Sequence, residues 1–391
     1  MDNRVYYGEY SLKHWIDLML KRNIVLPNYQ RHFVWSEEDV KTLIKTMEDN
    51  LFVPPITIGA FQTESQNKNL ILDGQQRLTS ILLAYIGRFP NENTFMDKSV
   101  VNFADENGED EDKKEENKVI LKWTFEELIR EGKTKEEIIR KITDINYRTF
   151  PIVVSENFFE ETFLGFSYLV PYLSNEQKQQ KFYSTVFRHI NDKGTPLLPQ
   201  ESRQSLYYLN GDLSGFFDPL FFHSIIIGAT TRNRADFVRY LALLSQYFHD
   251  GSPNGVARGY KSYMEDYYAE YIAVVADDTD SIFGKFSEIF PDKNYKDRIE
   301  VLEKTCTMLA IPKSLPSIIY ADIWFFGLIY TIVIENKRIN EADKAKLKDD
   351  VQREIDVFKN DSDHARSPNQ FKYLRDRIAT SIKIYEKYAK K

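Results

Sequence analysis

The first hundred residues alternate between short apolar runs and apolar stripes at helical spacing. One stripe begins after Ser11 and a second begins after Ser36, and serine is a common residue at the N-cap of a helix. Short apolar runs of strand type stand at 24–26, 53–59 and 70–72. The last of these leads directly into a third helical stripe. This alternation predicts a small α/β unit.

The second half of the chain has a different pattern. From about residue 205 the strand-type runs fade, and long aromatic-rich helical stripes follow. We therefore expect an α+β domain at 1–205 and an all-helical domain at 206–391. Residues 105–118 hold eight acids, three lysines and no apolar residue, which predicts a solvated loop within the first domain.

Composition narrows the classes of protein. With 391 residues, of which 42% are hydrophobic, the chain is long enough and apolar enough to bury sizeable cores, which excludes a largely disordered protein. A net charge of −7 argues against a surface coated for non-specific binding to nucleic acid, although it allows a local basic cleft. Cys306 is the single cysteine, which excludes an internal disulfide framework and a cysteine-clustered zinc site. A reducing cytoplasm fits best, and the first residues carry no apolar signal core.

The longest apolar stretch runs from Ile318 to Ile334 and contains Asp322. It is slightly short for a bilayer crossing and carries a charge near its start. A membrane span is one interpretation. We favour a buried helix of the helical domain, and expect no membrane association.

A chemically distinctive pentapeptide stands where the third apolar run becomes a helix. It consists of Asp73, Gly74, Gln75, Gln76 and Arg77. The start of a helix presents backbone N–H groups and the positive end of the helix dipole, which suits a phosphate. Glycine would let the backbone approach an anion, and the guanidinium would bind two of its oxygens. The pattern indicates a nucleotide pocket. A plain turn with a solvated arginine is the alternative, since the pentapeptide is neither a P-loop nor a dinucleotide fingerprint.

Two other segments complete a recognisable set. Upstream stand Tyr29-Gln30-Arg31 and Trp35; downstream stand Phe187-x-x-Ile190-Asn191-x-x-Gly194-Thr195-Pro196-Leu197 and then Glu201-x-Arg203. Alone, the downstream segment predicts only a capped loop between helices. The three motifs in this order resemble the N-terminal, GmrS-like domain of GmrSD modification-dependent restriction systems, and the resemblance covers about residues 8–205.

The resemblance implies a fold and an activity. Relatives have a fold related to ParB and sulfiredoxin, in which a Gly-x-x-Arg turn binds nucleotide phosphates, and Gly74 to Arg77 fits that turn. They bind and hydrolyse nucleoside triphosphates, and many serve in defence against phage. An Mg²⁺-dependent NTPase in a defence or restriction context is therefore the expected function.

Roles follow residue by residue from the same resemblance. Arg77 and the N–H groups after Gly74 would hold phosphates, Asp73 would bind Mg²⁺ or orient the attacking water, and Gln75 or Gln76 would position that water. Further contacts to the nucleotide are expected from Arg31, Asn191, Lys193 and Arg203.

The chain departs from full-length relatives in one respect. Those proteins often carry an HNH-type nuclease domain, whereas His364 here stands near Asn369 without a second histidine downstream. We expect a sensor or NTPase subunit whose effector is a partner protein. The main alternative is a non-catalytic module, in which nucleotide or DNA phosphates act as a switch and the helical half docks a partner.

Two clusters of basic residues would suit DNA phosphates, although solvated helix faces look the same and are the favoured interpretation. The first consists of Arg232, Arg234 and Arg239, and the second of Arg366, Lys372, Arg375 and Arg377.

Overall fold

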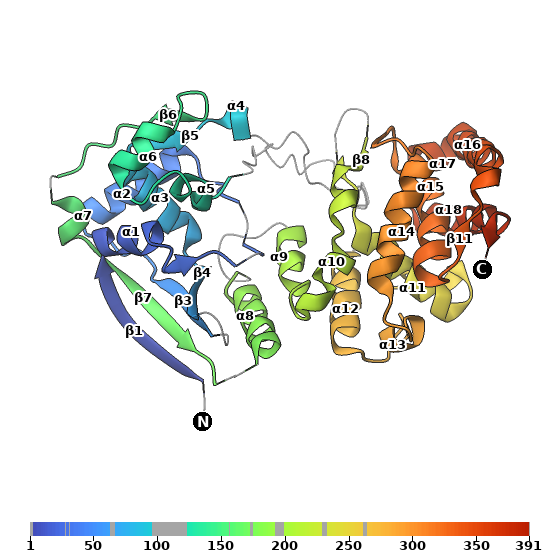
Figure 1. Cartoon of the computed structure of the whole chain (residues 1–391), viewed down its shortest axis with the longest axis horizontal. Coiled ribbons are helices and arrows are strands. Elements are labelled where there is room, and N and C mark those ends of the chain that lie inside the picture. Colours follow the sequence, from blue (N-terminus) through green and yellow to red (C-terminus); the bar gives the residue numbers. More distant parts are fainter. Residues whose placement is uncertain are drawn as a thin grey trace. The chain divides into compact units, whose positions relative to one another are not determined.

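The computed structural model describes residues 3–27, 29–30, 32–62, 67–95, 123–155, 157–172, 175–191, 199–228, 233–260 and 264–390. These residues form two compact units (Figure 1). One comprises the described residues up to 95 together with 123–209, and the other begins at Asn210. The first unit is α+β and the second is largely helical, which confirms the predicted fold class. The predicted acidic loop at 105–118 lies outside the described residues.

The first unit is built on a mixed five-stranded sheet in the order β1-β7-β3-β4-β2. Neighbours pair antiparallel at β1/β7 and β3/β4, and parallel at β3/β7 and β2/β4. Its strands are β1 (Arg4–Ser11), β2 (Ile24–Val25), β3 (Ile56–Gln62), β4 (Asn67–Asp73) and β7 (Phe163–Val170). The smaller elements of this unit are β5 (Arg88–Pro90), β6 (Tyr147–Thr149), α4 (Glu92–Phe95), α5 (Phe125–Ile129), α6 (Lys135–Lys141), α7 (Phe158–Glu161) and α9 (Pro199–Leu206).

Helices cover both faces of this sheet. The main core lies on one face, beneath α1 (Leu12–Leu20), α2 (Glu37–Glu48) and α3 (Gln75–Ile86). Ser11 and Ser36 cap α1 and α2, as their positions predicted, and Ser36 forms a full capping box with Asp39. The serines and the apolar stripes together therefore fix where these helices begin and which side they bury.

Helix α8 (Glu176–Asn191) packs on the opposite face through Tyr183. The buried Tyr183 hydroxyl donates to the carbonyl oxygen of Ala60 at 2.5 Å. A Cβ atom on the neighbouring Gly59 would lie 2.3 Å from the Tyr183 ring. Glycine at this position therefore allows α8 to approach the sheet closely.

The second unit consists of helices joined by short turns and two-residue strands. Its helices are α10 (Ser214–Phe217), α11 (Phe237–Asp250), α12 (Met264–Asp277), α13 (Phe286–Ile289), α14 (Tyr295–Met308), α15 (Ile318–Ile329), α16 (Lys344–Asn360), α17 (Ser362–Arg366) and α18 (Phe371–Glu386). The strands are β8 (Ile226–Ile227), β9 (Asn233–Arg234), β10 (Ser314–Leu315), β11 (Arg338–Ile339) and β12 (Ala389–Lys390).

The apolar stretch that begins at Ile318 is the buried helix α15, as the sequence indicated. It continues as a π-helical turn over Tyr330–Ile334. Within the described ranges, no helix combines the length and apolar content that a bilayer crossing would require.

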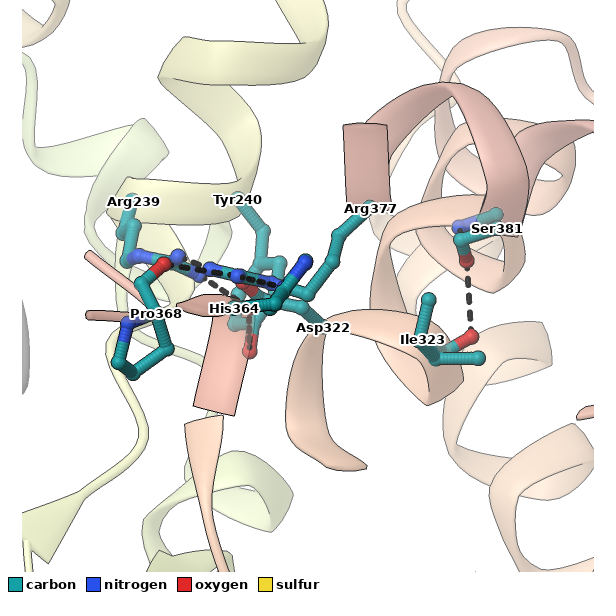
Figure 2. A network of polar contacts seen from close by, with 9 residues as sticks. Arg239, Tyr240, Asp322, Ile323, His364, Pro368, Arg377 and Ser381 are labelled. Carbon is teal, nitrogen blue, oxygen red and sulfur yellow. Dashed lines mark hydrogen bonds and ion pairs between the residues drawn. The ribbon is translucent and has the colours of Figure 1, made fainter. Parts of the chain in front are cut away.

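Asp322 lies in the middle of α15 and anchors a buried ion network (Figure 2). Arg239 of α11 donates to both carboxylate oxygens, at 2.6 and 2.9 Å, and Nε of Arg377 from α18 donates to Oδ2 at 2.9 Å. Burial raises the pKa of Asp322, but the two guanidinium groups outweigh burial and hold that pKa below its ordinary value. Buried ion pairs therefore connect helices α11, α15 and α18.

This network corrects the expectation for the two basic clusters. Arg239 and Arg377 are 3% and 0% exposed, so neither lies on a solvated helix face or is available to DNA. Arg375 donates to the carbonyl of Val256, and Arg234 pairs with Asp218. Arg232 lies outside the described residues. Arg234, Arg239, Arg375 and Arg377 are therefore engaged in internal contacts, whereas Arg366 and Lys372 are exposed, as a solvated helix face predicts.

His364 completes the network as a neutral acceptor. Nη1 of Arg377 donates to Nε2 of His364 at 2.8 Å and to the carbonyl of Pro368 at 2.7 Å. Burial, and next the charge of Arg377, lower the pKa of His364 from its ordinary 6.5 to about 4. The folded protein therefore holds this ring neutral over a pH range in which the unfolded chain protonates it.

We expect this histidine to make stability fall in acid. Between pH 6.5 and about 4 the unfolded state binds a proton that the folded state excludes, so unfolding becomes easier as the pH falls. A pKa shift of that size corresponds to about 3 kcal/mol once the pH is below 4. The comparison is urea unfolding of wild type and His364→Gln, whose amide oxygen also accepts from Arg377. The variant should lose about 3 kcal/mol less than wild type over this range, and parallel pH profiles would contradict the assignment.

Candidate functional site

The candidate site is the junction where β4 becomes α3. Asp73 is the last residue of β4, and Gly74 turns the chain with a φ of 90° before α3 begins at Gln75. This left-handed conformation favours glycine. In addition, a Cβ atom at this position would lie 2.3 Å from Cδ1 of Ile56. Backbone conformation and the neighbouring side chain both therefore select glycine here.

The N-cap residue of α3 is Gly74, which has no side chain to accept a hydrogen bond from the first N–H groups. The first hydrogen bond of the helix runs from the N–H of Leu78 to the carbonyl of Gly74, at 2.9 Å. Three backbone N–H groups precede it, where the helix itself offers no acceptor. Because the helix dipole adds positive potential at this end, the arrangement favours an anion.

Arg77 is held in place beside this helix start. Nη2 donates to Oδ2 of Asp73 at 2.6 Å, and Nη1 donates to the carbonyls of Pro54 and Pro55. The Arg77 side chain is 12% exposed and that of Asp73 is 34% exposed. The arginine of this turn is therefore not solvated, which corrects that part of the plain-turn alternative. Instead, Arg77 joins the end of β4, the start of α3 and the loop before β3.

Gln76 has a structural task. Its amide oxygen accepts from the backbone N–H of Val34, and its amide nitrogen donates to the carbonyl of His32, each at 3.0 Å. Both ends of the side chain are thus engaged in holding the upstream loop against α3. Gln75 is buried as well, at 4% exposed. In this arrangement the Gln76 amide holds the loop and is not directed toward a water molecule.

The upstream motif contacts both the strand before the pentapeptide and Phe187, the first residue of the downstream motif. Nε2 of Gln30 donates to the carbonyl of Ile71, two residues before Asp73, at 3.0 Å. The ring of Tyr29 packs on Phe187 of α8, with ring centroids 5.0 Å apart. Its hydroxyl is buried and has no hydrogen-bond partner among the residues that the structure describes. The upstream motif therefore connects the pentapeptide with the downstream motif.

Of the four further residues predicted to contact the nucleotide, the structure describes the side chain of Arg203 alone. Arg31 and Lys193 lie outside the described residues, and the side chain of Asn191 is likewise not described. Arg203 belongs to α9 and is 3% exposed. The immediate neighbours of Arg31 in sequence, Gln30 and His32, both hydrogen-bond to the β4–α3 segment.

One feature of the site was outside the reach of sequence reasoning. The spacing of Asp73 and Arg77 is typical of an ion pair within a helix turn, and that signal was available. The carbonyl acceptors from Pro54 and Pro55 were not, because no side-chain chemistry marks them. The buried cluster around Asp322 likewise depends on contacts between distant segments.

Comparison with known proteins places the first unit. Residues 14–208 match the family model described as the GmrSD restriction endonuclease, N-terminal domain. An uncharacterized protein of Methanocaldococcus jannaschii is 36% identical over 110 residues, which cover 22% of this chain and 19% of that protein. The chain thus matches about a fifth of the length of this curated relative. No solved structure matches the chain.

Proposed function

Because this chain belongs, through residues 14–208, to the GmrSD restriction endonuclease N-terminal domain family, we propose that it binds and hydrolyses a nucleoside triphosphate at the start of α3. The biological setting that we propose is a prokaryotic phage-defence or modification-dependent restriction system. DNA and a nuclease or other effector protein are the proposed partners. The observation that carries the biochemical part is the start of α3 at Gly74, where the first N–H groups have no acceptor within the helix, flanked by Arg77 and Asp73.

Phosphate chemistry fits the donors at this junction. Backbone N–H groups at the start of α3 supply hydrogen bonds, and Gly74 supplies the positive φ that turns the chain into this helix. Arg77 supplies a positive charge whose position is already fixed by the Pro54 and Pro55 carbonyls. The carbonyls hold Nη1, whereas Nη2 is paired with Asp73, so a phosphate that binds Arg77 competes with Asp73 for that donor. Further contacts from Arg31, Asn191, Lys193 and Arg203 remain part of the proposal.

Magnesium fits the same junction in a limited way. Mg²⁺ bound to nucleotides commonly takes one or two protein carboxylates, with phosphate and water oxygens as its other ligands. Asp73 is partly exposed and offers one such carboxylate. No group of three metal-binding side chains occurs among the described residues, so a site held by protein ligands alone is not supported there. Bound Mg²⁺ would neutralise phosphate charge, and Asp73 would hold it.

A second function is favoured by one specific observation. The amide of Gln76 is fully engaged with the backbone of Val34 and His32. One of the two amides expected to position water is therefore committed to holding a loop, which favours binding over hydrolysis. The chain would then be a nucleotide-gated adaptor that docks a partner through its helical unit. Saturable binding of nucleotide without phosphate release would select this function.

The first test compares Arg77→Gln with wild type. Removing the guanidinium should weaken binding of ATP, GTP, CTP or UTP with Mg²⁺ by tenfold or more, because charge-assisted hydrogen bonds to phosphate are lost. Binding is measured by calorimetry and turnover by phosphate release, each with and without DNA. Glutamine is two atoms shorter than arginine, so the variant removes the guanidinium together with its hydrogen bonds to the Pro54 and Pro55 carbonyls.

Arg148→Gln is the matched control. Arg148 also forms ion pairs in the first unit, with Glu37 and Glu92, but it belongs to β6 and not to the β4–α3 junction. Nucleotide affinity of this variant should equal that of wild type. If a folded Arg77→Gln protein binds nucleotide as tightly as wild type, the phosphate site is not at the start of α3.

A further inference from the structure

The loop between α2 and β3 carries an exposed aromatic ring, Phe52, two residues before the Pro54 carbonyl that accepts from Arg77. Phe52 is 83% exposed, whereas Phe33 and Phe89 of the same unit are at most 1% exposed. We propose that Phe52 is the nucleobase platform of the site, on which the base of a bound nucleoside triphosphate stacks. This inference rests on the proposed function and adds the part of the ligand that phosphate contacts leave unassigned.

Covalent geometry places Phe52 close to the phosphate-binding groups. Arg77 donates to the carbonyl of Pro54, two residues after Phe52. Two residues of extended chain span at most about 7 Å between Cα atoms. The side chain of Phe52 is therefore within the length of one nucleoside triphosphate from the guanidinium. A nucleoside triphosphate whose phosphates lie at Arg77 is therefore long enough for its base to reach this ring.

The loop that carries Phe52 is fixed on both sides. Before it, the N–H of Leu51 donates to the carbonyl of Thr46 at 2.9 Å, which closes the end of α2. After it, Val53 packs against the main core, and Pro54 and Pro55 accept hydrogen bonds from Arg77. An exposed ring on a backbone that is already ordered loses little conformational entropy when a ligand covers it.

Stacking predicts the kind of selectivity. Every base has a π face, so stacking on an aromatic side chain adds affinity and discriminates weakly among bases. The ligand class is therefore a nucleoside triphosphate with broad base tolerance, in which the larger purines gain most. Inorganic tripolyphosphate presents the same phosphates without a base, and it separates the two parts of the site.

The experiment measures binding of ATP and of tripolyphosphate, each with Mg²⁺, to the full chain. Phe52→Ala should weaken ATP binding about tenfold and leave tripolyphosphate binding unchanged. Phe52→Trp, which keeps an aromatic face, should bind ATP at least as tightly as wild type. Leu51→Ala is the control: Leu51 is also exposed, at 62%, but it has no aromatic face. This control should leave both affinities unchanged.

The outcomes separate the two proposals. If wild type binds neither ATP nor tripolyphosphate, the proposed function fails and this inference fails with it. If wild type binds both equally well, or if Phe52→Ala changes neither affinity, the phosphate site stands and the nucleobase platform is overturned. If Phe52→Ala weakens only a single-stranded oligonucleotide and not ATP, the ring serves nucleic acid, which also overturns the proposal.

Discussion

Replacing Asp322 by asparagine should lower the free energy of unfolding by about 3–5 kcal/mol. The carboxylate is completely buried and accepts from Arg239 and Arg377, which are themselves buried. Asparagine fits the same space but carries no charge, so two guanidinium groups would remain in the interior without their counter-ion. Removing one member of a buried ion network costs far more than the network contributes over an apolar replacement.

Chemical denaturation of the full chain measures this effect, provided that the unfolding of the second unit is followed separately. Asp350→Asn is the control, because Asp350 also pairs with basic groups but its side chain is 16% exposed. That variant should lose less than about 1 kcal/mol. In the double variant Asp322→Asn/Arg377→Met, part of the loss should be recovered, since one uncompensated charge is gone. A loss below about 1 kcal/mol for Asp322→Asn alone would show that the two arginines do not depend on this carboxylate.

Local features of the fold were predictable from local sequence. The serine caps and apolar stripes of α1 and α2 are encoded within a few residues, so both helices begin where the pattern indicated. The order of the sheet was not predictable in this way. Strand β1 pairs with β7, about 160 residues later. The sequence of neither strand indicates which strand it pairs with. Side-chain periodicity reports which face is buried and not which strand lies beside it.

The same distinction holds for the candidate site. Asp73, Gly74 and Arg77 were identified because strand, turn and helix signals meet within one short segment. The engagement of Gln76 was not foreseen, since it depends on backbone groups of a loop more than 40 residues upstream. In the sequence, Asp322 is recognisable only as an acidic residue within an apolar run. Its partners Arg239 and Arg377 belong to two other helices. The sequence therefore indicated candidate residues that are close together in the chain. It did not indicate contacts between residues that only folding brings together.

The largest functional effect is expected for Asp73→Asn, and its direction depends on the metal. In the present arrangement Nη2 of Arg77 is occupied by the Asp73 carboxylate. A phosphate must compete for that donor and also meets the negative charge of Asp73. Asparagine keeps an oxygen for Arg77 but removes the charge. Without Mg²⁺, tripolyphosphate should therefore bind the variant about tenfold more tightly than wild type.

With Mg²⁺ the order should reverse, because the cation takes the carboxylate in wild type and finds no charged ligand in Asp73→Asn. Phosphate release from nucleoside triphosphate should then fall at least a hundredfold. Asp144→Asn is the control, since Asp144 pairs with Arg88 and its side chain is 92% exposed. If Asp73→Asn weakened binding of metal-free tripolyphosphate, Asp73 would position Arg77 for phosphate and not compete for it. The sign of that one change thus decides whether the observed ion pair is a resting state that the ligand opens or part of the binding arrangement itself.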